Sequence, residues 1–499
     1  MESTDKAPCI CIFGTASDVG KSVIATALCR FFSNQGIKVA PFKAQNMSNN
    51  SGVTPEGLEM GRAQIVQAEA SKIPPHVDMN PVLLKPTSDT GAQVVVFGKA
   101  TENRTAIDYH KYKQQLFADV CKALDRLREI YELVIIEGAG SCAEVNLMAD
   151  DIVNFSIAEY AKAPVILVAD IHKGGVFAQI VGTLACLPPE QQNLVKGFII
   201  NRFRGDLSIF QNGIEWIEKK TGKPVFGVMP YYTDINIEEE DSVAIENPVK
   251  ISFFKDKQAA ICVLRIPHIS NFTDFAVLSS IKNLSVYFVE KLQSLSGFKA
   301  VIIPGSKNTR FDLEWLKKTG WAEEIRAYEK NGGSILGICG GYQMMGSYVD
   351  DPYGVEGKPG RASGLALLPV ETVLKAPKTT TLIRFSWGKE IGTGYEIHMG
   401  VTKRIAGSSM LQVIEQNGMP CSNENGCISE SNPKIAGTYI HGLFDNPGIT
   451  KRWFKTIGLD EITVLYPPAF ETKNREYDKL ADHFVKHIHT KQIHNLIKT

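Results

Sequence analysis

The chain has 499 residues, of which 44% are hydrophobic and 22% are charged. This composition is typical of a globular enzyme, and the length predicts two to four domains of about 150 residues each. Lys+Arg and Asp+Glu both number 54, so the formal net charge is zero. A neutral balance argues against non-specific binding to nucleic acid, because that binding needs an excess of positive charge.

The ten cysteines are scattered along the chain and none forms a C-x-x-C pair. This distribution predicts neither a disulfide framework nor a zinc site, and it favours the reducing cytoplasm. No run approaches the roughly 20 apolar residues of a membrane-spanning helix. The first apolar run, residues 9–13, is too short for the core of a signal peptide. We therefore expect a cytoplasmic protein without a membrane span, and the oligomeric state is left open.

Short apolar runs alternate with helical patterns through the first half of the chain. A run at 9–13 precedes helical spacing over Lys21–Asn34. Further candidate strands lie at 38–42, 133–136, 164–169, 197–200 and 225–228. Alternation of this kind predicts a doubly wound parallel sheet, and hence an α/β fold.

An acidic segment without periodicity, 236–248, separates this half from a second α/β unit. We place one domain at 1–240 and the other at 250–499. The strand candidates of the second unit are 259–266, 300–303 and 334–338. The tail at 477–493 is predicted to be a closing amphipathic helix.

A glycine-rich loop, Gly14-Thr-Ala-Ser-Asp-Val-Gly20-Lys21-Ser22, links the first run to the first helical pattern. Such a loop directs backbone N–H groups and a helix dipole at phosphate oxygens. Its lysine reaches the β- and γ-phosphates and its serine binds Mg²⁺. We expect Gly14, Thr15, Gly20, Lys21 and Ser22 to bind ATP. The loop is one residue longer than the usual G-x-x-x-x-G-K-[ST] pattern, and a glycine turn with an incidental lysine is the alternative.

Two later strands end on polar side chains that we expect near this loop. The run Leu133-Val-Ile-Ile-Glu137 places a carboxylate at a strand end, where it can hold Mg²⁺ directly or through water. Asn201 follows the run 197–200, and open α/β sheets bind ligands at the carboxyl ends of their strands. Glu137 is predicted to be a metal ligand, or else a cap on the next turn, and Asn201 is predicted to contact the nucleotide base. Residues 88–90 are interpreted as a turn.

A second signature is Gly337-Ile-Cys339-Gly340-Gly341, a cysteine version of the nucleophile elbow. Small residues tighten its strand-to-helix turn, and the helix N-terminus favours the thiolate. The N–H groups of Gly340 and of Gly305 are expected to form the oxyanion hole. His441, which follows a strand-like run, is the candidate general base and then acid. His398 is a weaker candidate that can equally be a packing residue.

Together the two signatures predict an enzyme with two coupled sites. The Cys339 thiolate attacks the side-chain amide of glutamine, forms a γ-glutamyl thioester and frees ammonia. A carboxylate resists ammonia because its leaving group would be oxide, so ATP first converts it to an acyl phosphate. The ammonia must arrive unprotonated, which implies a passage between the two halves.

Five longer strings carry a family resemblance. They are Pro41-Phe-Lys-Ala-Gln-Asn-Met-Ser-Asn-Asn50, Glu59-Met-Gly-Arg62-Ala-Gln64, Asn80-Pro-Val-Leu-Leu-Lys85, Pro267-His-Ile-Ser-Asn-Phe-Thr-Asp274 and Pro304-Gly-Ser-Lys-Asn-Thr309. In these strings the chain resembles cobyric acid synthases, and the similarity spans nearly its whole length. The resemblance implies ATP-, Mg²⁺- and glutamine-dependent amidation of the b, d, e and g carboxylates of a corrinoid, adenosylcobyrinic acid a,c-diamide. It also implies a P-loop unit of the dethiobiotin synthetase type, whose loop has the same longer spacing, followed by a flavodoxin-like class I glutaminase unit.

Within that mechanism, several charged residues are assigned to the substrates. We expect Lys43 to bridge phosphate and substrate carboxylate, and Glu59 to help bind Mg²⁺ or a substrate amide. The candidates for holding the carboxylates that are not reacting, or else simple surface charges, are Arg62, Lys85, Arg202 and Arg204.

The chain departs from related sequences at three places. Class I glutaminases usually carry His-x-Glu, but Gly442 and Leu443 follow His441, so the group that orients His441 is unassigned and Glu396 is the candidate. His172-Lys173 stands where Asp-Arg is usual, which removes a carboxylate. Histidines crowd the tail, where His483 and His487 are one helical turn apart; a solvated helix face is expected there rather than a metal site.

Two other functions fit parts of the pattern. One is another amidotransferase of the same architecture, such as cobyrinate a,c-diamide synthase or a cell-wall lipid-amidating ligase; the strings that begin at Pro41 and Pro267 argue against it. The other is a partitioning-type ATPase with an inert glutaminase-like module, which the intact Cys339 and His441 disfavour. The order of the amidations and the course of the ammonia are left open.

Overall fold

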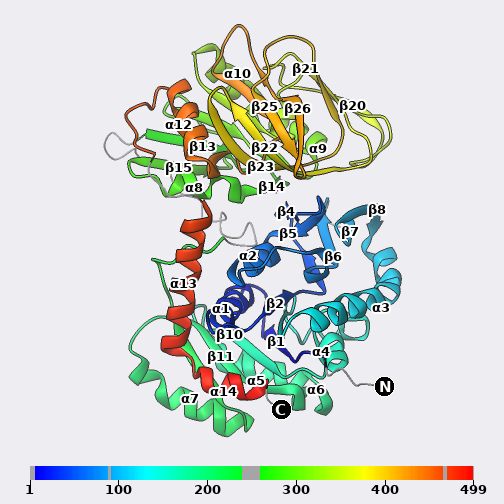
Figure 1. Ribbon diagram of the computed structural model, residues 1–499, viewed down its shortest axis with the longest axis vertical. Helices are drawn as coiled ribbons and strands as arrows, with labels where there is room; N and C mark the ends of the chain where they lie inside the picture. Colours follow the sequence, from blue (N-terminus) through cyan, green and yellow to red (C-terminus); the bar gives the residue numbers. More distant parts are fainter. Residues whose placement is uncertain (1–5, 88–90, 239–258, 465–468, 498–499) are drawn as a thin grey trace.

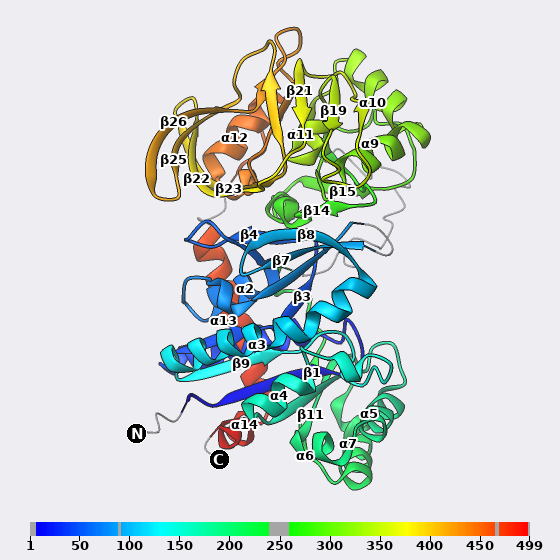
Figure 2. The same ribbon diagram turned by 90° about the vertical axis from the view of Figure 1, so that its right-hand side faces the viewer.

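The computed structural model describes residues 6–87, 91–238, 259–464 and 469–497. They form two α/β units that are stacked along the long axis of the molecule (Figures 1 and 2). The turn expected at 88–90 and most of the boundary expected at 236–248 lie outside the described residues.

A six-stranded sheet in the order β12-β11-β10-β1-β9-β2 is the core of the N-terminal unit. Every pairing in it is parallel. Because helices cover both faces, its strands are nearly continuous apolar runs. They are β1 (Cys9–Gly14), β2 (Val39–Phe42), β9 (Leu133–Glu137), β10 (Val165–Asp170), β11 (Val195–Phe203) and β12 (Val225–Pro230). The doubly wound sheet predicted from the sequence is confirmed.

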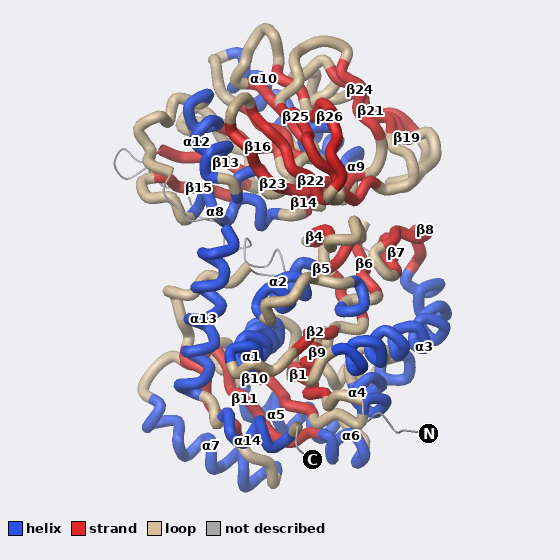
Figure 3. The backbone as a smooth tube through the Cα atoms, viewed as in Figure 1, coloured by secondary structure: helices blue, strands red, loops and turns tan. Residues whose placement is uncertain are grey.

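Helices surround this sheet (Figure 3). They are α1 (Lys21–Asn34), α2 (Arg62–Ala70), α3 (Ala106–Ile130), α4 (Phe155–Ala161), α5 (Val176–Cys186), α6 (Pro189–Leu194) and α7 (Leu207–Thr221). The residue that precedes α1, Gly20, has φ 94°, a left-handed conformation that glycine adopts without steric cost. The phosphate loop therefore turns directly into the helix.

A smaller layer lies between the N-terminal sheet and the C-terminal unit (Figure 2). It contains a four-stranded sheet, β3-β6-β7-β8, and a separate pair, β4-β5. Its strands are β3 (Gln45–Met47), β4 (Ser51–Val53), β5 (Glu59–Gly61), β6 (Val82–Pro86), β7 (Gly91–Val96) and β8 (Lys99–Thr105). In the first half of the chain, most of the strings that resemble cobyric acid synthases fall in this layer. The layer lies between the N-terminal sheet and the C-terminal unit (Figure 2).

The C-terminal unit has its own six-stranded sheet, in the order β15-β13-β16-β18-β28-β27. Only its β27–β28 pair is antiparallel. The strands are β13 (Ala259–Leu264), β15 (Leu284–Val289), β16 (Ala300–Ile303), β18 (Ile335–Ile338), β27 (Cys427–Ile428) and β28 (Ile435–Thr438). The helices are α8 (Ala276–Ser279), α9 (Thr309–Lys318), α10 (Trp321–Lys330), α11 (Gly340–Met344) and α12 (Pro447–Thr456). The second α/β unit predicted from the sequence is confirmed.

Antiparallel sheets that the sequence analysis did not predict flank this core. Their orders are β20-β19-β21-β24, β23-β22-β25-β26 and β14-β17. The strands are β14 (Ile269–Ser270), β17 (Gly305–Ser306), β19 (Tyr348–Asp351), β20 (Gly360–Ser363), β21 (Val370–Val373), β22 (Thr379–Trp387), β23 (Glu390–His398), β24 (Val401–Arg404), β25 (Leu411–Gln416) and β26 (Met419–Asn425). Many of their residues are half exposed, so they lack the continuous apolar runs that reveal the parallel strands.

The tail forms two helices rather than one, α13 (Ala469–His487) and α14 (Thr490–Leu496). They pack on the N-terminal unit, although the sequence-based division grouped them with the range 250–499. Phe484 is fully buried, with its ring centroid 6.3 Å from that of Phe31. Asp478 accepts a hydrogen bond from Nε of Arg30 at 2.7 Å. The apolar face of α13 is thus buried against α1 of the N-terminal unit (Figure 1).

Candidate functional site

A cavity of about 1270 Å³ opens at the carboxyl-end edge of the N-terminal sheet. The phosphate loop contributes Gly20, Lys21 and Ser22 to its wall, and Glu137 and Asn201 project from β9 and β11. Parallel strands bring their carboxyl ends to one edge, which is where open α/β sheets bind ligands. The structure thus gathers most of the predicted nucleotide residues around one space.

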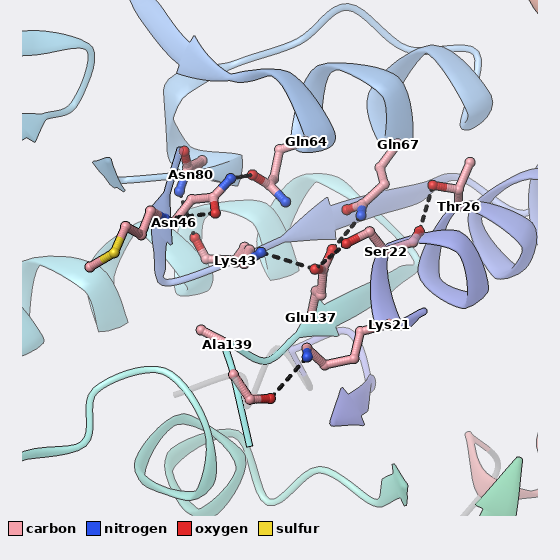
Figure 4. Close-up of polar contacts among 12 residues, drawn as sticks. Lys21, Ser22, Thr26, Lys43, Asn46, Gln64, Gln67, Asn80, Glu137 and Ala139 are labelled. Atoms are coloured by element: carbon pink, nitrogen blue, oxygen red, sulfur yellow. Dashed lines mark hydrogen bonds and ion pairs between the residues drawn. The ribbon is translucent and has the colours of Figure 1, made fainter. Parts of the chain in front are cut away.

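Glu137 is the centre of this site, and its side chain is fully buried. Ser22 Oγ donates to Glu137 Oε1 at 2.7 Å, and Lys43 Nζ lies 3.0 Å from the same oxygen. Gln67 Nε2 donates to Oε2 at 2.5 Å. Figure 4 shows these three side chains converging on the carboxylate. Gln67 was not among the predicted residues, since nothing but its place on α2 marks it.

A polar network holds Lys43 in position. Asn80 Nδ2 donates to the Lys43 carbonyl oxygen at 3.1 Å, and Asn46 Nδ2 donates to Gln64 Oε1 at 2.9 Å (Figure 4). Asn46, Gln64 and Asn80 are buried, and a buried polar group is costly unless it is hydrogen-bonded. The three residues belong to the strings that carry the family resemblance, so those strings build the scaffold of the site.

Side chains of the phosphate loop are held by hydrogen bonds to backbone carbonyl groups. Lys21 Nζ donates to the carbonyl oxygens of Ala16 and Gly140, at 3.2 and 2.9 Å. Thr15 Oγ1 donates to Val168 O at 3.4 Å, so this side chain points to the sheet. A Cβ on Gly14 would lie 2.8 Å from Ala16 O, which explains the glycine. Gly14 and Thr15 are therefore expected to contribute backbone geometry, not side chains, to nucleotide binding.

Asn201 and Arg202 brace the loop from β11. Asn201 Nδ2 donates to Val19 O at 2.9 Å. Arg202 forms ion pairs with Asp18 at 2.9 Å and with Asp170 at 3.1 Å. Both residues line the cavity, but their polar groups already hold the loop. Contact between Asn201 and the base stays a prediction.

His172 and Lys173, where the chain departs from the usual Asp-Arg, lie on the same wall. The backbone N–H of His172 donates to Asp170 Oδ1 at 2.6 Å. Lys173 Nζ lies 3.7 Å from Asp18 Oδ2. On this wall the carboxylate beside Lys173 and Arg202 is that of Asp18.

The oxygen atoms of Ser22 and Glu137 fit the preference of Mg²⁺ for hard oxygen ligands. No cluster of three or more His, Cys, Asp or Glu able to hold a metal occurs within the described ranges. Mg²⁺ usually keeps several waters and is bound through one or two protein groups plus substrate phosphates. Binding of Mg²⁺ by Ser22 and Glu137, together with nucleotide phosphates, stays a prediction.

Glu59, the third predicted metal ligand, does not join this pair. Its fully buried carboxylate lies 2.7 Å from Nζ of Lys85 and 2.6 Å from Nζ of Lys378. Two ammonium groups around one carboxylate repel a further cation. Glu59 is instead an ion-pair centre between β5, β6 and the C-terminal unit, which argues against its predicted role as a metal ligand; binding of substrate by Glu59 or Lys85 stays a prediction.

Arg62 and Arg204 are also engaged within the protein. Arg62 Nε lies 2.5 Å from Glu238 Oε2, and both side chains are largely buried. The guanidinium of Arg204 lies over the ring of Tyr231, 3.8 Å from its centroid. Arg62 is therefore not the surface charge that the sequence left open, whereas Arg204 is exposed, and binding of substrate carboxylates by either residue stays a prediction.

The predicted nucleophile, Cys339, stands between β18 and α11 with φ 51° and ψ −109°. Backbone strain of this kind is concentrated at functional sites. A Cβ on Gly341 would lie 1.9 Å from Ile303 O, and one on Gly340 would lie 2.7 Å from Ser306 N. Both positions therefore require glycine, and the turn has the form expected of a nucleophile elbow.

His441 has a buried partner that the sequence analysis missed. Its Nδ1 lies 2.7 Å from Oδ2 of Asp274, and the side chains of His441 and Asp274 are 1% and 5% exposed. The backbone N–H of Gly442 donates to Asp274 Oδ1 at 3.1 Å, which fixes the carboxylate. Asp274 lies in the short 3-10 helix Phe272–Phe275. Its position in the string from Pro267 marked it as part of the resemblance, but not as a partner of His441.

Electrostatics keeps the His441 ring charged. Burial lowers its pKa, but the carboxylate of Asp274 and the neighbouring Cys339 outweigh this effect and raise the pKa to about 10. The ring of Tyr395 stacks on it, with centroids 5.2 Å apart and planes at 18°. A histidine so held has one orientation and one charge state near neutral pH.

Glu396, the candidate orienting group, does not contact His441. It accepts a hydrogen bond from Asn425, and its Oε2 lies 3.9 Å from Nε2 of His398. The His398 ring stacks on Tyr439, with centroids 3.7 Å apart. His398 lines the pocket beside Cys339, but the acid in contact with His441 is Asp274.

The two predicted oxyanion-hole glycines lie near the cysteine and the histidine. Gly340 opens α11 immediately after Cys339. Gly305 lies in β17, paired with Ser270, and a Cβ on it would lie 3.3 Å from Cε1 of His441. Both glycines thus have their backbone at the reacting groups, and their donation to an oxyanion stays a prediction.

A small pocket at Cys339 is lined by both units. Lys85 comes from the N-terminal unit, whereas the C-terminal unit supplies Lys307, Glu356 and Lys378. Hydrogen bonds also cross this interface, because Ser51 N donates to Asn271 Oδ1 at 3.0 Å and Asn308 Nδ2 donates to Thr87 O at 3.2 Å. Cys339 therefore lies at the boundary between the two units.

Two histidines of the tail, His483 and His487, bond to backbone carbonyl groups. His483 Nε2 lies 3.1 Å from Pro230 O, and His487 Nδ1 lies 2.9 Å from His483 O. Each ring thus bonds to a backbone carbonyl. These two rings are half-buried against the N-terminal unit rather than fully solvated.

Comparison with known protein families assigns each of the two units to a family. Residues 10–244 match the CobQ/CobB/MinD/ParA nucleotide binding domain, and residues 260–449 match the CobB/CobQ-like glutamine amidotransferase domain. A cobyric acid synthase of Chlorobium phaeobacteroides is 51% identical over 98% of this chain and 97% of its own length. One of Chlorobaculum tepidum is 54% identical over 89% of each chain.

The chain belongs to the cobyric acid synthase family. Among solved structures, PurLQS from Thermotoga maritima aligns over 46% of this chain and 100% of its own, at 14% identity and a TM-score of 0.29, which is too low to carry an argument. In this member of the cobyric acid synthase family, the two matched ranges contain the phosphate loop and the Cys339 site respectively. Helices α13 and α14 lie beyond both matches. None of the described helices combines the length and the apolar character needed to cross a bilayer.

Proposed function

We propose that this protein is a cytoplasmic ligase that amidates the b, d, e and g side-chain carboxylates of adenosylcobyrinic acid a,c-diamide, giving adenosylcobyric acid. ATP and glutamine are the co-substrates. The observation that carries the proposal is the pairing, in one chain of this family, of a phosphate-loop cavity with a buried Cys339–His441–Asp274 site at the boundary between the units.

Glutamine is cleaved at the C-terminal site. The Sγ of Cys339 bonds to the side-chain carbonyl carbon, and backbone N–H groups stabilise the oxyanion that forms. The imidazolium of His441, held by Asp274, gives its proton to the departing nitrogen as the C–N bond breaks. Water then attacks the thioester, with His441 as base, and glutamate leaves. Because His441 and Asp274 are both buried, His441 stays in the same position for thioester formation and for thioester hydrolysis.

The acid is activated at the N-terminal site. The loop backbone and Lys21 hold the phosphates of ATP, and an oxygen of the substrate carboxylate attacks the γ-phosphorus to give an acyl phosphate and ADP. Mg²⁺, when held by Ser22 and Glu137, supplies charge neutralisation at these phosphates. Lys43, fixed beside Glu137, is placed to attract the incoming carboxylate. Ammonia from the other site then displaces phosphate and leaves an amide.

The volume of the cavity at the phosphate loop supports a large substrate. About 1270 Å³ exceeds the volume range typical of small-ligand pockets. Repeated amidation of one corrinoid requires that several of its carboxylates be presented in turn, so a wide space is an advantage.

The decisive test is mass spectrometry of the corrinoid after incubation with the protein, ATP, Mg²⁺ and glutamine. We expect product masses that change in steps of one amide. Cys339→Ala should abolish synthesis from glutamine and retain synthesis from ammonium salts. Lys21→Ala should stop synthesis from both nitrogen sources. A corrinoid that stays unchanged with either nitrogen source would refute the proposal, as would loss of both activities in the Cys339 variant.

A further inference from the structure

The pocket at Cys339 contains two charged side chains that the reaction steps above do not use, Lys307 and Glu356. Glu356 is fixed from two sides: its Oε1 accepts from Thr309 Oγ1 at 3.1 Å, and its Oε2 accepts from Arg310 N at 3.2 Å. Lys307 directly follows β17, and its backbone N–H donates to His268 O at 2.9 Å. Both residues are thus attached to the start of α9, on one side of the pocket.

The ammonium of Lys307 has no hydrogen-bond or ion-pair partner within the described part of the chain. Burial and then the charge of Lys85 lower its pKa to about 8, against the opposing carboxylates of Glu356 and Glu59. Burial, with Lys85 and Lys307, also lowers the pKa of Lys378 to about 7, although Glu59 opposes it. A buried cation of this kind is stabilised by an anion that enters the pocket.

The charged side chains around the pocket form two sets. Lys85, Lys307 and Lys378 face the two carboxylates of Glu59 and Glu356, and Glu59 is already shared between Lys85 and Lys378. One ammonium and one carboxylate therefore remain for a ligand. An α-amino acid carries one group of each sign on a single carbon, and its side chain is then free to extend to Cys339.

We propose that Lys307 binds the α-carboxylate and Glu356 binds the α-amino group of glutamine. This inference rests on the proposed function, because it presupposes that glutamine reacts at Cys339. It deepens that function by assigning the groups that recognise an amino acid rather than a simple amide. Lys85 completes the wall from the N-terminal unit.

The first test measures glutamine hydrolysis by Glu356→Gln and Lys307→Met in the full-length protein. We expect KM for glutamine to rise by about 10- to 100-fold, the loss typical of a charge-assisted contact, with kcat nearly unchanged. Corrinoid amidation with ammonium salts should stay at the wild-type rate, which also shows that each variant is folded. Matched control variants are Lys330→Met and Glu323→Gln, whose side chains are exposed on α10.

A second test uses substrates that lack one group. Glutaramate has no α-amino group, and 4-aminobutanamide has no α-carboxylate. Wild type should prefer glutamine to both. Glu356→Gln should no longer prefer glutamine to glutaramate, but should still prefer it to 4-aminobutanamide. Lys307→Met should no longer prefer glutamine to 4-aminobutanamide, but should still prefer it to glutaramate. If each variant keeps the wild-type preferences, or if KM is unchanged, the subsite assignment is wrong.

Alkylation of Cys339 separates this inference from the proposed function. A glutamine-like diazoketone, 6-diazo-5-oxo-L-norleucine, should label the two variants about 10- to 100-fold more slowly than wild type. Iodoacetamide, which carries no amino-acid head, should label all of them at the same rate. Equal labelling by the diazoketone in variants and wild type overturns the subsite. A wild type that neither hydrolyses glutamine nor reacts with the diazoketone overturns the proposed function instead.

Discussion

The carboxylate of Asp274 lies 2.7 Å from Nδ1 of His441, although 167 residues separate the two along the chain. The usual His-x-Glu arrangement would place the orienting acid two residues after the histidine. Here that acid comes from the short 3-10 helix Phe272–Phe275, and the N–H of Gly442 holds its second oxygen. The chain therefore retains a complete cysteine–histidine–acid site while lacking the local sequence pattern that normally reveals one.

We expect Asp274→Asn to reduce kcat for glutamine hydrolysis by about 10²- to 10⁴-fold, because an amide neither fixes the imidazole nor stabilises its charge. KM should change little, since Asp274 does not face the amino-acid head. Amidation with ammonium salts should be retained. Glu396→Gln is the control, because Glu396 bonds to Asn425 and not to His441. Equal losses in both variants would contradict the assigned role of Asp274.

The ion pair of His441 and Asp274 should make stability depend on pH. The pKa of His441 is raised from its ordinary 6.5 to about 10 in the folded protein. Its contribution is therefore fully present below about pH 6.5 and is lost as pH rises to about 10. We expect the free energy of unfolding in urea to fall across this interval in wild type, and to fall less in Asp274→Asn. Parallel pH profiles would show that the pair does not persist in solution.

Replacing Glu59 tests the corrected role of that residue. In Glu59→Gln, Lys85 and Lys378 lose the buried carboxylate that they share. Removing one partner of a buried ion pair typically costs about 3–5 kcal/mol, which urea unfolding will measure. The Mg²⁺ concentration needed for half-maximal ATP turnover should not change. A higher Mg²⁺ requirement at unchanged stability would instead restore Glu59 as a metal ligand.

The tail should stabilise the N-terminal unit. Phe484 is fully buried against Phe31, and truncation of a buried phenylalanine typically costs about 3–5 kcal/mol. We expect Phe484→Ala to lose ATP-dependent amidation in mild urea, before glutamine hydrolysis is affected. Val485→Ala is the matched control, because Val485 is 46% exposed on the same helix. Prior loss of glutamine hydrolysis would mean that the tail supports the C-terminal unit.

The sequence predicted the parallel strands well because burial on both faces makes each of them a continuous apolar run. The antiparallel strands were missed for the opposite reason. Strand β26 is mostly exposed, so the period-two pattern that would reveal it is weak. The tail was predicted to be amphipathic, but its pattern carries no information about which unit it covers.

The same distinction separates the site residues. Ser22 and Glu137 were placed together from the sequence, since Ser22 follows the phosphate loop after β1, Glu137 ends β9, and the carboxyl ends of parallel strands share one edge. Asp274, Gln67 and the Glu59 ion pairs could not be found that way. Each depends on the approach of segments that no local spacing links, and the charge of a residue does not reveal which partner will neutralise it.

The sequence by itself therefore predicted two local features. One is a loop that needs glycine to approach phosphates, and the other is a cysteine on a turn too tight for larger neighbours. Those features are decided over a few bonds, where steric fit alone selects the residue. The partner of His441, the contacts of Lys85 and Lys378, and the docking of α13 were decided only in three dimensions. Burial there forces distant polar groups to satisfy one another, and that choice is made by the packing of the whole chain.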